Sequence, residues 1–150
     1  MIVSICYTPE STKIPRPEDH YTRTPIDSVE LIAGRGIDGD RKGNKYEARQ
    51  INLMAAETLE ALSREGFKTG PGQMGEQIVV RGVDVDHLKP GDRVKLGESA
   101  ILEVDKARTG CDRFEHIQGQ PKSRVAGRLG QMMRVLVSGA IRVGNAAKKE

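Results

Sequence analysis

The apolar residues of this chain fall into short runs that are separated by turns rich in glycine and proline. Runs of roughly four to eight residues with alternating or β-branched side chains are typical of β-strands when turn residues bound them. Such runs occupy residues 2–7, 28–33, 49–53, 77–80, 92–96, 100–104, 134–137 and 140–143. Their close spacing between residues 77 and 104 predicts a meander, and the last two runs predict a hairpin. The chain is therefore expected to fold mainly as sheet.

Only one segment has a clear helical period. Between residues 54 and 65, apolar side chains recur at helical spacing, and Gly66 follows as a stop signal. A weaker helix is predicted over residues 112–117, and the polar, proline-punctuated residues 8–25 predict a long loop. Many short strands with one or two short helices favour a mostly β (α+β) fold, a small and mainly antiparallel β-barrel.

The length of the chain limits how many domains it can form. A chain of 150 residues suits one domain with a single core, and neither a repeat nor a linker interrupts the sequence. The domain is thus expected to span residues 1–150, with the charged tail at 146–150 frayed.

Charge is distributed unevenly along the chain. Residues 106–150 hold 10 Lys or Arg against 3 Asp or Glu, whereas residues 1–105 hold 14 against 18. A positive field of this kind attracts nucleic acid, a membrane surface or a small anionic ligand. Nucleic acid is the less favoured partner, because Phe114 is the one aromatic side chain there on which a base could stack.

No apolar run reaches the ~20 residues that cross a membrane, and the first residues lack the basic flank and apolar stretch of a signal peptide. The sequence therefore predicts a cytoplasmic protein with no membrane contact.

The segment from Gly34 to Gly39 has the glycine spacing of a dinucleotide-binding fingerprint. That fingerprint requires a helix to begin directly after it, but residues 40–45 offer no apolar stripe. The glycines instead predict a tight turn that presents Asp40 and Arg41 to a ligand, or an ordinary charged turn.

Two other polar positions have alternative interpretations. Arg49 shares a strand face with apolar neighbours and so needs an anionic partner, either a bound phosphate or a salt bridge to Asp40 or Glu76. The salt bridge is the favoured interpretation. Glu76 follows Gly75 directly, and it either accepts hydrogen bonds from the amine groups of a heterocycle or is a solvated turn residue.

The two cysteines lie in different settings, and they are too few for a disulfide framework or a CxxC site. Cys6 lies in the first predicted strand, where a small buried thiol packs as a modest hydrophobe. Cys111 lies in a loop between Arg108 and Arg113, and cationic neighbours favour the nucleophilic, metal-binding thiolate. Reactive and inert interpretations of Cys111 are evenly balanced on these grounds alone.

Five segments in a fixed order resemble a known family. They are GIDGDR at 36–41, RQINLMAAE at 49–57, MGEQIVVRG at 74–82, LKPGDRVKLG at 88–97 and LEVDKARTGC at 102–111. No single segment is specific, but this order, ending in a cysteine after Arg-Thr, resembles the MOSC family, the domain named for the C-terminus of molybdenum cofactor sulfurase. The resemblance covers about residues 29–144. It implies a β-barrel-like fold and a molybdenum pyranopterin cofactor.

The resemblance also implies site residues and a chemistry. Cys111 becomes the catalytic residue, as molybdenum ligand or as persulfide carrier. The implied cofactor contacts are Asp40, Arg41, Arg49, Gln50, Gly75, Glu76 and Arg108. The implied enzyme is either a molybdenum-dependent oxidoreductase that reduces N-hydroxylated compounds or a sulfurtransferase. Either activity would need a separate electron-transfer or sulfur-donor protein, and no pyridoxal phosphate is expected within this chain.

The residue types agree with that chemistry, because a soft thiolate suits a metal already held by dithiolene sulfur and arginines suit a phosphate. The sequence departs from the family pattern at three places: Gln77 stands where Asn often follows Gly-Glu, Gly110 stands where Pro often precedes the cysteine, and no His follows Gly-Asp-Arg at 39–41. The alternative to a cofactor protein is a non-catalytic basic barrel that binds nucleic acid or an acidic protein partner through its C-terminal third.

Overall fold

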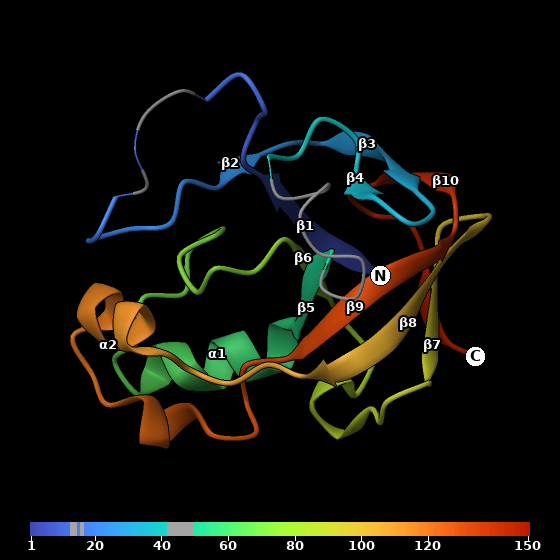
Figure 1. The fold of residues 1–150 in the computed structure, drawn as a ribbon. Coiled ribbons are helices and arrows are strands. Elements are labelled where there is room, and N and C mark those ends of the chain that lie inside the picture. The colour runs from blue at the N-terminus through green and yellow to red at the C-terminus, as the bar shows by residue number, and fades with distance from the viewer. Residues whose placement is uncertain (13–14, 16, 42–49) are drawn as a thin grey trace.

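The computed structural model describes residues 1–12, 15, 17–41 and 50–150 (Figure 1). In this part of the chain, an eight-stranded sheet, a three-stranded sheet and two α-helices form the fold. The strands are β1 (Ile2–Tyr7), β2 (Thr24–Pro25), β3 (Ser28–Ile32), β4 (Gly36–Ile37), β5 (Ile51–Ala55), β6 (Ile78–Val80), β7 (Arg93–Leu96), β8 (Ala100–Ala107), β9 (Gln131–Val137), β10 (Gly139–Arg142) and β11 (Ala147–Lys149). The helices are α1 (Ala56–Arg64) and α2 (Asp112–Gln118), with 3-10 turns at Val85–His87 and Lys122–Val125.

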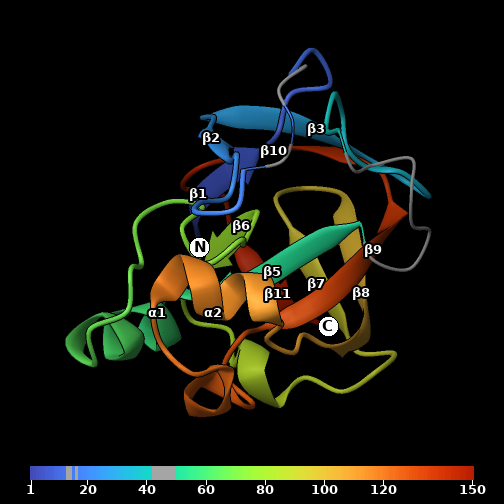
Figure 2. The same ribbon diagram turned by 60° about the vertical axis from the view of Figure 1, so that its left-hand side comes forward.

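The larger sheet has the order β11-β7-β8-β9-β5-β6-β1-β2, and the smaller one has the order β10-β3-β4. Figure 2 shows β3 and β10 crossing above the strands of the larger sheet. Every pairing between named strands is antiparallel except that of β5 with β6, which is parallel. A parallel pair needs a crossover connection, and α1 lies within the connection from β5 to β6.

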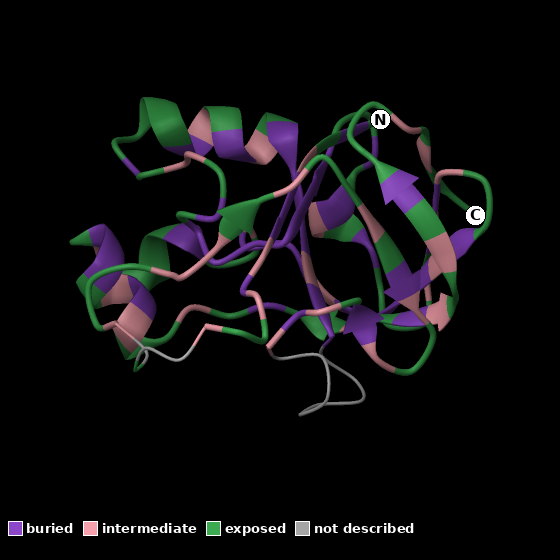
Figure 3. Cartoon of the chain, turned by 90° about the horizontal axis from the view of Figure 1, so that it is seen from above, coloured by how far each residue is buried: buried purple, intermediate pink, exposed green. Residues whose placement is uncertain are grey.

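Two apolar clusters hold these elements together. The larger lies between the sheets and is built from Val, Ile and Leu side chains, whereas the smaller lies under the helices, where Phe67 and Phe114 stack at 6.5 Å between ring centroids. Each fully buried large apolar side chain contributes about 1.5–3 kcal/mol. Figure 3 colours the whole chain by burial and shows buried and exposed segments alternating along it. Along β9 buried and more exposed residues alternate. One face of this strand therefore belongs to the core.

Much of the predicted secondary structure is confirmed. The fold is mostly sheet, mainly antiparallel, with two short helices, and β1 spans the predicted residues. In α1 the buried Leu59 and Leu62 provide the predicted apolar face. The strand pairings found among the described residues do not close either sheet into a barrel, so the barrel remains a prediction.

Two predictions about pairing are wrong. The run at 140–143 does not form a hairpin with β9, because β10 pairs with β3 and places Ile141 opposite Val29. The tail is not frayed, because β11 pairs with β7 and so covers the edge of the larger sheet. The meander predicted for the runs at 77–80, 92–96 and 100–104 forms only in part, because β7 pairs with β8 but β6 pairs with β1 and β5 instead of β7. Among the described helices, none is long and apolar enough to cross a membrane.

Candidate functional site

A cavity of about 330 Å³ lies where the end of β8 approaches the N-terminus of α2. Its walls come from five parts of the chain: the loop before β2, β5, the glycine-rich turn before β6, the end of β8 with its connection to α2, and β9. The lining residues are Tyr21, Arg23, Asn52, Gly75, Lys106, Arg108, Thr109, Gly110, Cys111 and Met132. The structure thus brings three predicted site residues together, namely Gly75, Arg108 and Cys111.

Cys111 is exposed and lies directly before α2, with extended backbone angles. Its carbonyl accepts the first hydrogen bond of the helix, from the amide of Glu115 at 3.1 Å. The preceding Gly110 packs so closely that an added Cβ would lie 2.7 Å from Cβ of Lys122. A bulkier residue would press on that side chain, which explains why this chain has glycine there. The thiol is consequently both solvent-accessible and part of a cavity wall.

Arg108 is the most deeply buried cation of the cavity. Its backbone amide donates to the carbonyl of Gly130 at 3.0 Å, which fixes the chain where β8 ends. Burial lowers the pKa of its guanidinium, and Tyr21, Glu76 and Cys111 oppose that effect. Despite this burial, Nη1 of Arg108 has no hydrogen-bond partner among the described residues.

Tyr21 and Arg23 belong to the cavity but were not predicted from the sequence. Arg23 donates from Nη1 to the hydroxyl of Thr8 at 3.1 Å and from Nη2 to the carbonyl of Gly75 at 3.2 Å. Both residues lie in the predicted long loop at 8–25, where no local pattern marks them. Their role depends on where the loop lies in the folded chain.

Buried donors without acceptors characterise this cavity. In the part of the chain that the structure describes, Oη of Tyr21, Nε of Arg23 and Nη1 of Arg108 are shielded from solvent and have no partner. A buried polar group left unpaired costs about 1–3 kcal/mol, so native proteins satisfy nearly all of them. A ligand that carries several acceptor oxygens would satisfy these three. The residues present therefore fit an anionic group next to a thiol.

Asp40 lies in a buried network that adjoins the cavity through Thr8 and Asn52. Its carboxylate accepts hydrogen bonds from the amide of Thr8 at 3.1 Å and from Nε2 of Gln77 at 3.0 Å. Oε1 of Gln77 in turn accepts from the amide of Asn52 at 2.9 Å. The glutamine at position 77 thus joins the Asp40 turn to β5, which gives a structural reason for this departure from the family pattern.

Shortening Gln77 should break one end of this network. An asparagine is one methylene shorter and cannot reach both Asp40 and Asn52, so we expect Gln77→Asn to lose about 1–3 kcal/mol of unfolding free energy. Urea denaturation measures the loss. The control is Gln73→Asn, whose side chain accepts a hydrogen bond from the amide of Gly70 in an exposed turn; its loss should cost only about 0.5 kcal/mol, because water replaces an exposed hydrogen bond. Equal stability of Gln77→Asn and the wild type would contradict the structural role.

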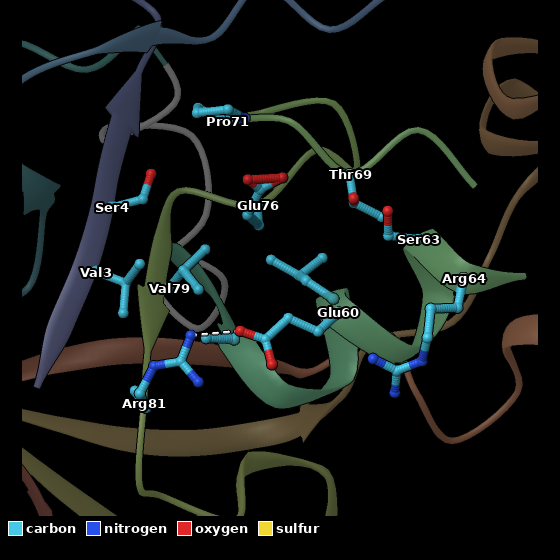
Figure 4. A pocket seen from close by; sticks show the side chains of 12 residues that line it. Val3, Ser4, Glu60, Ser63, Arg64, Thr69, Pro71, Glu76, Val79 and Arg81 are labelled. Carbon is cyan, nitrogen blue, oxygen red and sulfur yellow. Dashed lines mark hydrogen bonds and ion pairs between the residues drawn. The ribbon is translucent and has the colours of Figure 1, made fainter. Parts of the chain in front are cut away.

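Glu76 organises the turn before β6. Its carboxylate accepts hydrogen bonds from the amides of Gly72 at 2.7 Å and Met74 at 3.1 Å. Burial raises the pKa of Glu76, although these backbone hydrogen bonds oppose the rise. Glu76 lines another cavity, of about 440 Å³, and Figure 4 shows it there with Ser4 of β1 and Glu60 of α1. Its predicted role as a cofactor contact stays a prediction.

The remaining predicted contacts do not line the Cys111 cavity in the part that is described. Oε1 of Gln50 accepts from the amide of Val135 at 2.8 Å, which ties the start of β5 to β9. Arg41 donates its backbone amide to the carbonyl of Thr8 at 2.7 Å. Arg49 lies outside the described residues, so neither of its predicted partners can be assigned.

A family model and several solved structures match this chain. The family model described as "MOSC domain" matches residues 38–148. The structure of YiiM from Escherichia coli has a TM-score of 0.68 and 19% identity, over 99% of this chain and 69% of that one. The structure of YiiM from Geobacillus stearothermophilus has a TM-score of 0.71 and 20% identity, over 100% and 74%. YuaD from Bacillus subtilis has a TM-score of 0.71 and 20% identity, over 98% and 94%.

At these identities the structural likeness shows a shared fold and nothing about activity. None of the curated proteins matches this chain.

Proposed function

The chain belongs to the MOSC domain family, and from that premise we propose that it binds a molybdenum pyranopterin cofactor in the Cys111 cavity. The observation that supports this most is the set of shielded, acceptor-less donors of Tyr21, Arg23 and Arg108 beside an exposed cysteine. In this proposal the thiolate of Cys111 coordinates molybdenum. The buried guanidinium groups bind the anionic parts of the cofactor.

The donor set favours a metal that arrives already chelated. Among the described residues, no group of three or more His, Cys, Asp or Glu could hold a metal ion. One thiolate is a poor site for a bare cation, but it suits the last open position of a soft, sulfur-ligated metal. When bound, the cofactor would supply the two-electron chemistry that converts an N-hydroxylated compound to its amine and water, with electrons from a separate redox protein.

The same thiol supports a second function, sulfur transfer. Cys111 is exposed, so a separate donor protein that itself carries a cysteine persulfide could pass its outer sulfur to Sγ and leave as the free thiol. The reductase and the sulfur carrier share the thiol and the cavity. They differ in what Cys111 holds in the purified protein, which an experiment can distinguish.

The test uses protein expressed in a host that makes the cofactor. We expect the wild type to carry molybdenum, by metal analysis, and pterin, by fluorescence after oxidation. Cys111→Ser should lose the reductase activity and retain less of both molybdenum and pterin, because a hydroxyl is a hard and weakly acidic replacement for the thiol. It should keep part of both, because the cationic wall is unchanged and the metal stays with the cofactor that chelates it. The matched control is Cys6→Ala, since Cys6 is buried in β1 and lies outside the cavity lining.

Other outcomes separate the alternatives. Release of thiocyanate on treatment with cyanide, from the wild type but not from Cys111→Ser, would identify a persulfide carrier. A serine variant that keeps cofactor and activity at wild-type levels would refute a role for the thiol. A wild type without metal or pterin, whose affinity for polyanions falls steeply with salt, would favour the basic binding module instead.

A further inference from the structure

Residues 17–23, here called the strap, run beside α2 and complete one wall of the Cys111 cavity (Figure 1). Arg113, the second residue of α2, holds the strap in place. Its Nη2 donates to the carbonyls of Pro17 at 3.0 Å and His20 at 3.1 Å. Since Cys111 directly precedes α2, one helix terminus positions both the thiol and the strap.

The aromatic ring of Tyr21 is held between two neighbours. The guanidinium of Arg113 lies over the ring, with its central carbon 4.8 Å from the centroid. Gly75 lies close to the ring carbon that bears the hydroxyl, because an added Cβ would be 3.0 Å from that atom. These contacts fix the direction of the phenol. The contacts with Arg113 and Gly75 therefore determine where the hydroxyl of Tyr21 lies.

The hydroxyl of Tyr21 is available as a donor. Burial raises the pKa of Tyr21, although the neighbouring charge of Arg108 opposes the rise, so the phenol keeps its proton at neutral pH. No acceptor for that proton occurs among the described residues. Even a hydrogen bond from Arg108 to the phenol oxygen would leave the phenolic proton unpaired.

The two arginines of the cavity also have buried hydrogen-bond donors without acceptors. Arg23 uses Nη1 and Nη2 on Thr8 and Gly75, which leaves Nε without a partner, and Nη1 of Arg108 also has none. Within the described residues, neither guanidinium forms an ion pair with a carboxylate. The nearby carboxylate of Glu76 already accepts two backbone hydrogen bonds. Positive charge and unused donors thus belong to residues that line the same cavity.

We propose that Tyr21, Arg23 and Arg108 form an oxyanion-binding subsite beside Cys111, in which the phenol and both guanidinium groups donate hydrogen bonds to one phosphate-like group. The inference rests on the proposed function in so far as both place an anionic ligand in this cavity. It goes further because Tyr21 and Arg23 precede the residues that the family model matches. The oxyanion belongs either to the cofactor or to the substrate.

The first test uses the protein without cofactor and inorganic phosphate as the probe. Phosphate in the subsite should slow alkylation of Cys111 by iodoacetamide, while the buried Cys6 stays unreactive. Tyr21→Phe removes the hydroxyl and keeps the ring under Arg113. Loss of one hydrogen bond to a charged group should raise the phosphate concentration needed for half-protection about tenfold.

The stability of Tyr21→Phe distinguishes a ligand-binding hydroxyl from one that only supports the fold. Because the hydroxyl has no partner in the described structure, Tyr21→Phe should leave the thermal midpoint of the phosphate-free protein unchanged or raise it. The matched control is Tyr7→Phe, since Tyr7 packs against the core of the sheets and does not line the cavity. Equal protection in wild type and Tyr21→Phe, or no protection of the wild type by phosphate, would overturn the subsite.

A second arm distinguishes the source of the oxyanion. In a host that makes the cofactor, Tyr21→Phe should retain less pterin than Tyr7→Phe if the oxyanion is the cofactor's phosphate. Unchanged pterin with weakened phosphate protection assigns the subsite to the substrate. If the wild type carries no pterin or molybdenum, the proposed function fails, but the phosphate experiment on the cofactor-free protein still decides the subsite.

Discussion

Gly130→Ala should destabilise the fold by about 4 kcal/mol, the largest loss that we expect from a methyl group at any of the described glycines. Gly130 has a positive φ of 74°, and an added Cβ would lie 2.0 Å from the carbonyl oxygen of Leu53 and 2.9 Å from Cγ of Met54. The left-handed backbone costs an alanine about 1–2 kcal/mol, and overpacking adds about 1–3 kcal/mol. Rotating a side chain cannot relieve the contact, because the nearest atom belongs to the backbone of β5.

Gly127→Ala is the matched control for that prediction. Gly127 has nearly the same φ, 77°, but an added Cβ would meet nothing within 4 Å among the described residues. Alanine there should cost only the backbone contribution, about 1 kcal/mol. Urea unfolding of the two variants compares them directly. Losses of equal size would mean that β5 does not approach Gly130 as the structure shows.

The close approach at Gly130 also explains how the fold builds its candidate site. The carbonyl of Gly130 accepts the hydrogen bond from the amide of Arg108, and its Cα lies against Leu53 of β5. The start of β9 therefore connects the strand that carries Asn52 to the loop that carries Arg108. Both side chains line the cavity, so the packing that stabilises the sheet also sets the cavity's width.

Sequence patterns predicted the elements whose signal is local. β1 has a β-branched run, and α1 has an apolar face of Leu59 and Leu62 with a glycine after it. Pairing partners were predicted less well, because they depend on contacts between distant residues. β10 pairs with β3 across more than a hundred residues, and β11 is a short charged segment without apolar alternation. Neither run contains a sequence pattern that identifies the strand with which it pairs.

The residues of the candidate site also differ in how well the sequence predicted them. Motif order predicted Cys111, Arg108 and Gly75, and the structure brings these three together. Residue type alone did not separate ligand contacts from structural hydrogen bonds, since the buried carboxylates of Asp40 and Glu76 each accept bonds from the protein itself. Tyr21 and Arg23 carried no local signal, because a polar loop places them at the cavity only through tertiary contacts with Arg113 and Gly75.

Gly75 lies at the centre of the candidate site, because several cavity residues contact its backbone. Its carbonyl accepts hydrogen bonds from Nη2 of Arg23 and from Nδ2 of Asn52, both at 3.2 Å. On its other side, an added Cβ would lie 2.7 Å from Nη2 of Arg108 and 3.0 Å from Cζ of Tyr21. A methyl group at this position would therefore push on two of the three proposed oxyanion donors at once.

Gly75→Ala should weaken ligand binding about a hundredfold, because a displacement of about 1 Å at a positioned group can have an effect of that size. The φ of Gly75 is 82°, and Gly82 provides the control, with φ 84° and nothing within 4 Å of an added Cβ in the described structure. Both alanine variants carry the same backbone cost, about 1–2 kcal/mol. The flexible end of Arg108 can move aside, so the two stabilities should stay similar while binding does not.

Retention of pterin and protection of Cys111 by phosphate both measure this loss, and urea unfolding measures the two stabilities. We expect Gly82→Ala to bind like the wild type and Gly75→Ala to lose protection at every phosphate concentration that protects the wild type. Equal binding by both variants would show that Arg108 and Tyr21 do not hold the ligand. A much lower stability of Gly75→Ala would show instead that the Arg108 guanidinium is held rigidly, so that the cavity cannot adapt without unfolding.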